Sequence, residues 1–577
     1  MLHSLYTPTG EYLSNHPELI PWDVDHPNPQ FQREKWLNLN GYWDFAVSPR
    51  ADLPEIYDRK IRLPFAPESL LSGIGEHFPE GSYLFYTREI VLPESFTGKR
   101  VLLHIGAADQ VTHVYVNGGL VGHHEGGYTS MTFDLTSALP GCQFTLTIRV
   151  QDDLRDLSFP YGKQTLHRGG MWYTPVSGIW QSVWLESVPL DYISGLDIHA
   201  TPEKVTITTT GAPKTGSVSI QTPQGTVDVP LTHGQAVYVP DSPRLWSPED
   251  PYLYWFTVTA GEDQVYAYFA IRTLEIKTIR GIPRLCLNGE PRFFHGLLDQ
   301  GYWSDGLYTP ASPECYYWDI LAMKKLGFNT LRKHIKVEDP RFYYHCDGLG
   351  MIVFQDMVNN GDYSFLRDTA LPTVGLQKLP DKSLHKDPLT RKRFLDTMTA
   401  TVRQLKNHPS VCYWTIFNEG WGQFDSSAAY SALLALDSTR FIDSTSGWFR
   451  CGETQVDSRH IYFRKLKLKP SDKPLVLSEF GGYAWKVEGH VFNTDSTYGY
   501  GKFTNRESFA HAIEALYLEQ VLPLAKNGLC AAIYTQLSDV EDETNGLTTY
   551  DRRVEKLNPQ RMMEIAEALQ QAFRESL

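Results

Sequence analysis

The chain has 577 residues, which at ~150 residues per domain allows about three to four domains. Hydrophobic residues make up 42% and charged residues 21% of the chain, and no apolar run approaches the ~18 residues of a membrane-spanning helix. The 53 basic and 67 acidic side chains give a net charge of −14 without a basic cluster. This balance disfavours nucleic acid and anionic membranes as partners.

The seven cysteines are scattered, odd in number and never spaced Cys-x-x-Cys. This pattern indicates reduced thiols and neither a zinc knuckle nor a disulfide framework. Residues 1–24 contain several acidic side chains and prolines, and they show no basic segment followed by an apolar one. A secretory signal is therefore not expected, and the sequence predicts a cytoplasmic protein.

Residues 1–188 are expected to form a first domain built of β-strands. The strand-like runs are rich in Val, Ile, Thr and aromatic residues and are separated by Gly and Pro. They cover residues 83–92, 100–105, 111–116, 144–150 and 179–186. Asn117-Gly118 lies between two such runs and is a strong hairpin signal. Two stacked antiparallel sheets, as in a sandwich or jelly roll, would bury these strands.

Residues 189–276 are expected to form a second β-domain with shorter, more strictly alternating strands. Runs at 205–210, 217–220, 236–239 and 254–259 are separated by turn residues about every ten positions. A span of roughly 90 residues fits an immunoglobulin-like β-sandwich.

Residues 277–577 alternate strand-like and helical segments, which predicts a (β/α)₈ barrel. The eight strands are expected at 292–298, 329–335, 351–355, 411–417, 441–444, 460–463, 475–478 and 531–536. Ser312-Pro313 and Asp339-Pro340 are helix-start signals, and Gly327 and Gly350 are helix-stop signals. Further helices are expected at 388–406, 426–436, 507–526 and 559–573. The long segment 359–386 after the third strand is expected to be a loop over the site.

Two glutamates follow apolar strands where barrel strands end. Glu419 lies in WTIFNEG (414–420), and Glu479 lies in LVLSEFGG (475–482). Catalytic side chains gather at this face of a barrel, and a buried carboxylate needs a fixed partner if its role is only structural. Pairing of either glutamate with a rim arginine is the structural alternative. Two carboxylates at one face are what glycoside hydrolysis requires, one to protonate the leaving oxygen and one to attack the anomeric carbon.

With these glutamates in place, the sequence resembles glycoside hydrolase family 2, which contains β-galactosidases, β-glucuronidases and β-mannosidases. The resemblance covers nearly the whole chain and is carried by an ordered set of motifs: WLNLNGYWDF (36–45), GAADQVTHVYVNGGLVGHHEGGYTSMTFDLT (106–136), SGIWQSVWLE (177–186), YFAIRTLEI (268–276), LNGEPRFFHG (287–296), FNTLRKHI (328–335), DPRFYYHCDGLGMIVFQD (339–356), FNEG (417–420) and SEFGG (478–482). It implies a sugar-binding jelly roll, an immunoglobulin-like domain and a catalytic barrel, in that order.

The resemblance also implies roles for individual residues. Glu419 matches the acid/base and Glu479 the nucleophile, while Asn418 matches the residue that hydrogen-bonds the sugar 2-OH. Arg332 matches an arginine beside the nucleophile, and Tyr462 matches a tyrosine near the same carboxylate. These matches imply hydrolysis with retention and carboxyl groups ~5–5.5 Å apart.

Other candidates come from strand ends alone. His334 alternates with Arg332 and would face the same way, either to bind a hydroxyl or to satisfy a core hydrogen bond. Asp299 and Asp356 are candidates for binding sugar hydroxyls, with loop capping as the alternative. Lys333 and Lys336 are expected to be solvated.

Three tryptophans follow barrel strands, namely Trp421, Trp448 and Trp485. They are candidates for a wall that stacks on a sugar, and packing is the alternative for each of them.

Three departures from the family pattern bear on the substrate. No Asn-x-Lys tripeptide occurs, which disfavours a glucuronidase unless Arg332, Lys502 or Arg506 supplies the charge. Strand two reads Arg-Lys-His rather than Arg-x-Ser-His, and the chain ends with the barrel, so the metal sites of the best-known β-galactosidases are not expected. Residues 296–300 read GLLDQ in place of Gly-x-Asn-x-His.

The sequence therefore predicts a retaining exo-β-glycosidase that acts on a carbohydrate substrate without a cofactor. No metal ligands are predicted, and whether any metal ion binds is left open. Galactose is favoured by its frequency in the family rather than by any residue. The alternatives are glucuronides, mannosides, galactofuranosides and arabinosides. From other classes, a carbohydrate-binding protein with an idle barrel stays open, and the charge disfavours a nucleic-acid-processing barrel. Relatives often self-associate through their β-domains, so a homo-oligomer is an open expectation.

Overall fold

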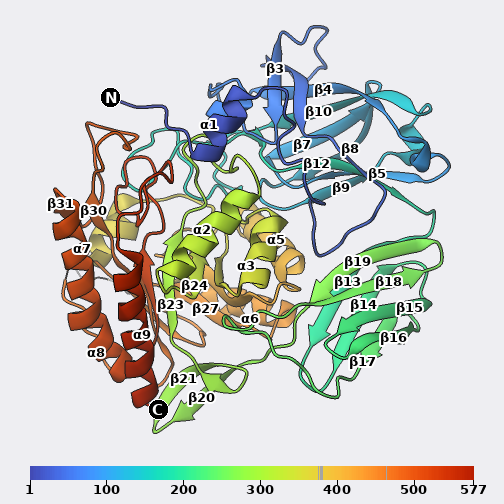
Figure 1. Ribbon diagram of the computed structural model, residues 1–577. Helices are drawn as coiled ribbons and strands as arrows, with labels where there is room; N and C mark the ends of the chain where they lie inside the picture. The colour runs from blue at the N-terminus through green and yellow to red at the C-terminus, as the bar shows by residue number, and fades with distance from the viewer. Residues whose placement is uncertain (374–375, 377–380, 463) are drawn as a thin grey trace.

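The computed structural model describes residues 1–373, 376, 381–462 and 464–577, which form three successive units (Figure 1). The first unit begins with the short helix α1 (Pro8–Asn15) and contains a four-stranded and a six-stranded antiparallel sheet. Its strands are β1 (Trp36–Asn38), β2 (Gly41–Ser48), β3 (Arg59–Leu63), β4 (Tyr83–Val91), β5 (Arg100–Ile105), β6 (Ala108–Asp109), β7 (Val111–Val116), β8 (Gly119–Glu125), β9 (Met131–Asp134), β10 (Gln143–Gln151), β11 (Gly178–Ile179) and β12 (Val183–Val188).

The apolar faces of the two larger sheets share one core, as the alternating strands require. The predicted hairpin is present: Val116 of β7 pairs with Gly119 of β8 across Asn117 (φ 47°) and Gly118 (φ 80°). Positive φ at both turn residues suits a two-residue hairpin, which is why Asn-Gly was informative. The sandwich prediction is confirmed.

The second unit is a smaller sandwich of a three-stranded and a four-stranded antiparallel sheet with its own core. Its strands are β13 (Ile193–Ala200), β14 (Val205–Gly211), β15 (Gly216–Thr222), β16 (Gly225–Leu231), β17 (Gln235–Tyr238), β18 (Tyr254–Ala260) and β19 (Asp263–Phe269). A three-stranded sheet then leads into the barrel and consists of β20 (Leu274–Ile279), β21 (Ile282–Leu287) and β22 (Glu290–Pro291).

The third unit is a nearly closed barrel of eight parallel strands in the order β27-β26-β25-β24-β23-β32-β29-β28. β27 and β28 stand at the two ends of this order. The barrel strands are β23 (Phe294–Asp299), β24 (Thr330–Lys333), β25 (Ile352–Asp356), β26 (Val411–Asn418), β27 (Phe441–Ser446), β28 (Asp457–Ile461), β29 (Leu475–Gly481) and β32 (Leu529–Thr535). Two short strands beside it are β30 (Tyr483–Trp485) and β31 (Gly501–Phe503).

Helices cover the outside of the barrel (Figure 1). They are α2 (Glu314–Lys325), α3 (Pro340–Leu349), α4 (Leu371–Thr373), α5 (Pro388–Leu405), α6 (Ser426–Leu436), α7 (Arg506–Ala515), α8 (Leu522–Lys526) and α9 (Pro559–Glu575). Asp339 caps α3 by accepting a hydrogen bond from the Arg341 amide, as the sequence predicts, whereas no side chain caps α2. None of the described helices is both long and apolar enough to cross a membrane.

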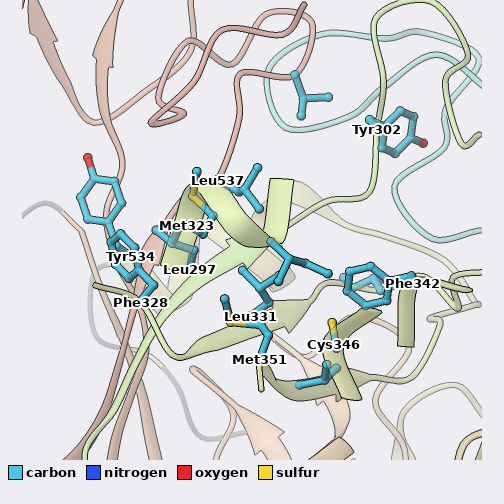
Figure 2. Packing of buried hydrophobic residues seen from close by; sticks show 14 of the residues in the cluster. Leu297, Tyr302, Met323, Phe328, Leu331, Phe342, Cys346, Met351, Tyr534 and Leu537 are labelled. Atoms are coloured by element: carbon cyan, nitrogen blue, oxygen red, sulfur yellow. The ribbon is translucent and has the colours of Figure 1, made fainter. Parts of the chain in front are cut away.

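Two strands show how the barrel wall orients its side chains. Leu297 of β23 and Leu331 of β24 pack among apolar residues that include Met323 of α2 (Figure 2). Because neighbouring side chains on a strand point to opposite faces, Arg332 points away from that layer and into the barrel. The helix layer therefore fixes which residues reach the site.

Two predicted segments differ from the structure. The sixth strand spans Asp457–Ile461 rather than 460–463, and residue 463 lies outside the described residues. The predicted loop 359–386 contains a π-helical segment (Leu366–Ala370) followed by α4, and its residues 374–375 and 377–380 also lie outside the described residues. Because the helical stretches in this segment are short, its apolar residues show no clear helical period in the sequence.

Candidate active site

Two glutamates and a histidine meet at the carboxyl end of the barrel. Glu419 directly follows β26, Glu479 lies in β29, and the two residues are only 6% and 5% exposed. The His460 imidazole lies between them, with Nδ1 2.8 Å from Glu419 Oε1 and 3.5 Å from Glu479 Oε2. Glu419 has a φ of 51°, a backbone conformation that non-glycine residues adopt mainly at turns and functional sites.

Arg332 connects the nucleophile candidate to two other strands. Its fully buried guanidinium donates to Glu479 Oε1 at 3.1 Å and to Asn418 Oδ1 at 2.9 Å. Its Nε also donates to the Asp356 carboxylate at 3.0 Å, which in turn lies 2.7 Å from His334 Nδ1. Asp356 and His334 are thus brought next to Arg332, where they orient the guanidinium.

The Asn418 side chain presents an unpaired donor. Arg332 engages its Oδ1, so the amide group points Nδ2 away from the guanidinium. Among the described residues this buried Nδ2 has no hydrogen-bond partner. A buried amide donor without a partner costs free energy, and a ligand hydroxyl would satisfy it.

Tyr462 completes the surroundings of Glu479. Its hydroxyl donates to Glu479 Oε2 at 2.5 Å and lies 2.9 Å from Thr535 Oγ1 at the end of β32. Two donors, Tyr462 and Arg332, therefore fix the Glu479 carboxylate in one orientation.

The two glutamates have opposite pKa shifts. Burial and the charge of Glu479 raise the pKa of Glu419, against the lowering effect of its hydrogen bond to His460. Burial would also raise the pKa of Glu479, but His460 and Arg332 outweigh it and lower that pKa to about 2. A protonated acid beside an ionised carboxylate is the division that acid/base and nucleophile roles require.

His460 is a site residue that the sequence analysis missed. Its Nδ1 contacts Glu419, and its Nε2 lies 3.4 Å from Arg332 Nη1 and 3.1 Å from Ser446 Oγ. The signal was present, because His460 and Tyr462 are two residues apart and share a face of the sixth strand.

The ligand atoms of Glu419, His460 and Glu479 lie within 4.8 Å of one another, a spacing that would also admit a metal ion. No other group of this kind occurs in the part of the chain that the structure describes. The expectation that the chain has no metal ligands stays a prediction.

The three candidate tryptophans lie in different surroundings. The Trp448 ring lies 6.4 Å from His460 and is half-buried beside the cluster. Trp421 is buried and stacks on Trp172 of the first unit at 5.1 Å. Trp485 packs on Phe509 of α7, so no contact brings it to the glutamates.

Asp299 also stands apart from the cluster. Its carboxylate accepts from Lys333 Nζ at 2.6 Å and from the Gly301 amide at 2.9 Å, which agrees with the loop-capping alternative. Lys502 and Arg506 are exposed, and Arg506 donates to backbone carbonyls near α9.

The prediction that Lys333 and Lys336 are solvated is wrong. Each is 1% exposed, and both ammonium groups donate to Glu338, at 3.0 Å from Lys333 and 2.8 Å from Lys336. Helices cover the outer face of β24, where Lys333 lies, and Trp180 and Tyr308 cover Lys336 in the loop after the strand. Each lysine is therefore buried and must be paired.

Family models match most of the chain. Residues 76–189 match the sugar-binding domain of glycosyl hydrolases family 2, residues 197–272 match the family 2 model, and residues 283–490 match the family 2 TIM-barrel domain.

Curated relatives are β-galactosidases and a β-glucuronidase. The chain is 28% identical to a β-galactosidase of Thermoanaerobacter pseudethanolicus over 79% of this chain and 62% of that enzyme. It is 27% identical to a β-galactosidase of Vibrio vulnificus over 69% of this chain and 38% of that enzyme. It is 25% identical to a β-glucuronidase of Sus scrofa over 76% of this chain and 73% of that enzyme. The chain thus spans less than two thirds of both β-galactosidases.

Solved structures share the fold. A β-D-glucuronidase of Dictyoglomus thermophilum superposes with a TM-score of 0.71 at 17% identity, covering 95% of this chain and 98% of that one. A β-galacturonidase of Eisenbergiella tayi gives a TM-score of 0.67 at 16% identity, covering 96% and 99%. With the domain order and three matching family models, the chain belongs to glycoside hydrolase family 2.

Proposed function

We propose that the chain is a retaining exo-β-glycosidase. The observation that carries the proposal is the close approach of Glu419 and Glu479, which have ligand oxygens within 4.8 Å of each other and of His460 Nδ1. Retaining enzymes hold their carboxyl groups about 5–5.5 Å apart, whereas inverting enzymes leave about 6.5–9.5 Å for a water molecule.

In the first step Glu479 attacks the anomeric carbon while Glu419 gives its proton to the leaving oxygen, and a glycosyl-enzyme ester forms. In the second step Glu419 removes a proton from water, which attacks the same carbon and releases Glu479. The unpaired Asn418 amide is positioned to bind the sugar 2-OH.

The favoured glycone is galactose, and β-galactosidases among the curated relatives support it. A β-glucuronidase is the second candidate, supported by the relative from Sus scrofa. The expected cytoplasmic location and self-association stay predictions.

A panel of p-nitrophenyl glycosides tests the proposal: β-galactoside, β-glucoside, β-mannoside, β-glucuronide, galactofuranoside and both arabinoside ring forms, each with wild type and Glu479→Gln. One glycoside should be hydrolysed by wild type and not by the variant, and proton NMR should show a first product with the same anomeric configuration as the substrate. A first product of the opposite configuration would contradict retention. Full turnover by Glu479→Gln would contradict the nucleophile assignment, and binding without turnover would favour the carbohydrate-binding alternative.

A further inference from the structure

A series of contacts leads from Glu479 to a second glutamate, Glu543. The Tyr462 hydroxyl, which binds Glu479, also contacts Thr535, and the next residue Gln536 donates to Glu543 Oε2 at 2.7 Å. Glu543 Oε2 accepts a second hydrogen bond, at 2.9 Å, from the hydroxyl of Tyr173 in the first unit. Glu543 is 4% exposed.

The series continues through Lys163, also from the first unit, and returns to the acid/base candidate. Lys163 Nζ lies 5.9 Å from the centre of the Tyr173 ring and 5.0 Å from the centre of the Trp421 ring. Trp421 is two residues after Glu419. Through these contacts Lys163 is placed near both Glu543 and the segment that carries the acid/base candidate.

The Lys163 ammonium is held by ring faces alone. The residue is 6% exposed, and within the described ranges its ammonium makes neither a hydrogen bond nor an ion pair. Ring faces attract a cation only weakly, so the three N–H groups of the ammonium can donate to a ligand.

Tyr173 contacts both Lys163 and Glu543: its ring lies against the ammonium and its hydroxyl binds the carboxylate. The charge of Lys163 opposes the increase in the pKa of Glu543 that burial causes, and it also lowers the pKa of Glu419. No ion pair joins Lys163 to Glu543, so the ammonium and the carboxylate do not touch. Each therefore has capacity for a third group.

A hydroxyl suits both groups, because it can accept from an ammonium and donate to a carboxylate at once. A sugar carboxylate would gain Lys163 but face Glu543, and like charges at short range oppose binding. Arg332 offers no second cation for such a carboxylate, since Glu479, Asp356 and Asn418 already occupy its donors.

We propose that Lys163 and Glu543 form a hydroxyl-binding subsite that selects neutral glycones over uronic acids. The proposal rests on the glycosidase function above and names its substrate class. It assigns part of the specificity to the first domain, which supplies Lys163.

Kinetics with paired neutral and uronic substrates test the subsite. Wild type should favour the p-nitrophenyl β-galactoside or another neutral glycoside over the β-glucuronide and β-galacturonide. Lys163→Met and Glu543→Gln should each lower kcat/KM for the neutral substrate by about 10- to 100-fold, the loss of one hydrogen bond to a charged group. Only Glu543→Gln should lower the ratio of kcat/KM for the neutral substrate to kcat/KM for the uronides. This substitution alone removes the carboxylate charge that repels a uronic acid. Lys60→Met, which replaces an exposed lysine on β3 of the same unit, is the matched control and should change nothing.

Measuring lactone binding to the Glu479→Gln variant tests this subsite independently of the proposed catalytic function. Calorimetry with D-galactono-1,4-lactone and D-glucaro-1,4-lactone should show preference for the neutral lactone, which Lys163→Met weakens, even if no glycoside is turned over. Preference of wild type for a uronide that Lys163→Met abolishes would overturn the subsite as described. Active enzyme with both variants unaffected would also overturn it. Melting curves confirm that each variant is folded.

Discussion

His460 couples the two catalytic candidates because one imidazole contacts both carboxylates. Replacing it with phenylalanine removes the hydrogen bond that lowers the pKa of Glu419 while burial and Glu479 still raise it. The basic limb of the kcat/KM profile should therefore move to higher pH, and kcat should fall by about 10²-fold as Glu419 loses its fixed orientation. Profiles of wild type and His460→Phe across pH 4–10 check this. An unmoved basic limb would show that His460 serves packing alone.

Glu419→Gln should have opposite effects on rate and stability. The rate for poor leaving groups should fall by about 10²- to 10⁴-fold, and the basic limb should disappear because no proton remains to be lost. The folded-state pKa of Glu419 is raised above its unfolded value, so its contribution to stability is present below about pH 4.5 and is lost as pH rises through the folded value.

Glutamine does not ionise, so the Glu419→Gln variant does not lose this contribution to stability as pH rises. Glu419→Gln should therefore melt at a higher temperature than wild type at pH 8, with the difference shrinking toward pH 4.5. A constant difference at every pH, measured by calorimetry, would contradict an ionisation effect.

At the scale of elements, β24 and the loop after it show what the sequence could reveal. The alternation of Arg332 and His334 was readable, because it depends only on strand geometry. The burial of Lys333 and Lys336 was not, because it depends on helices and on acidic partners elsewhere in the chain. Asp299 belongs to β23, and its pairing with Lys333 appears only when the two strands lie side by side.

Glu338 is the partner on which both lysines depend. It is fully buried, accepts from Lys333 and Lys336, and also accepts from the Tyr316 hydroxyl at 2.8 Å. Glu338→Gln leaves the buried Lys336 ammonium without a carboxylate partner and Lys333 with Asp299 alone. The substitution should therefore cost about 3–5 kcal/mol in the free energy of unfolding. Urea unfolding measures this cost.

The control is Asp396→Asn on α5, which breaks an exposed pair with Lys392 and should change stability by less than about 0.5 kcal/mol. Equal small effects of both substitutions would contradict a buried network around Glu338.

For the whole molecule, the order of the three units was predictable because composition and periodicity change between them. The two glutamates were also predictable, since each directly follows an apolar strand. Lys163 was not, because Trp421 and Glu543 come from two segments of the barrel that are distant from it in the chain. Contacts between units carry no local pattern.

The barrel has a seam, and the seam passes through the site. β27 and β28 have no backbone ladder between them in the described strands, whereas each pairs with its other neighbour. Side chains hold the seam instead: Ser446 Oγ lies 3.1 Å from Ser458 Oγ and 3.1 Å from His460 Nε2.

A strand that is hydrogen-bonded along only one edge opens locally at a lower cost in free energy than a strand that is hydrogen-bonded along both edges. Amide hydrogens of β28 should therefore exchange with deuterium sooner than those of β32, as mass spectrometry of peptic fragments can measure, and equal protection would contradict this. His460, which lies in β28, would then belong to the part of the barrel that unfolds locally first. Heat or mild denaturant should therefore abolish turnover before the protein unfolds globally.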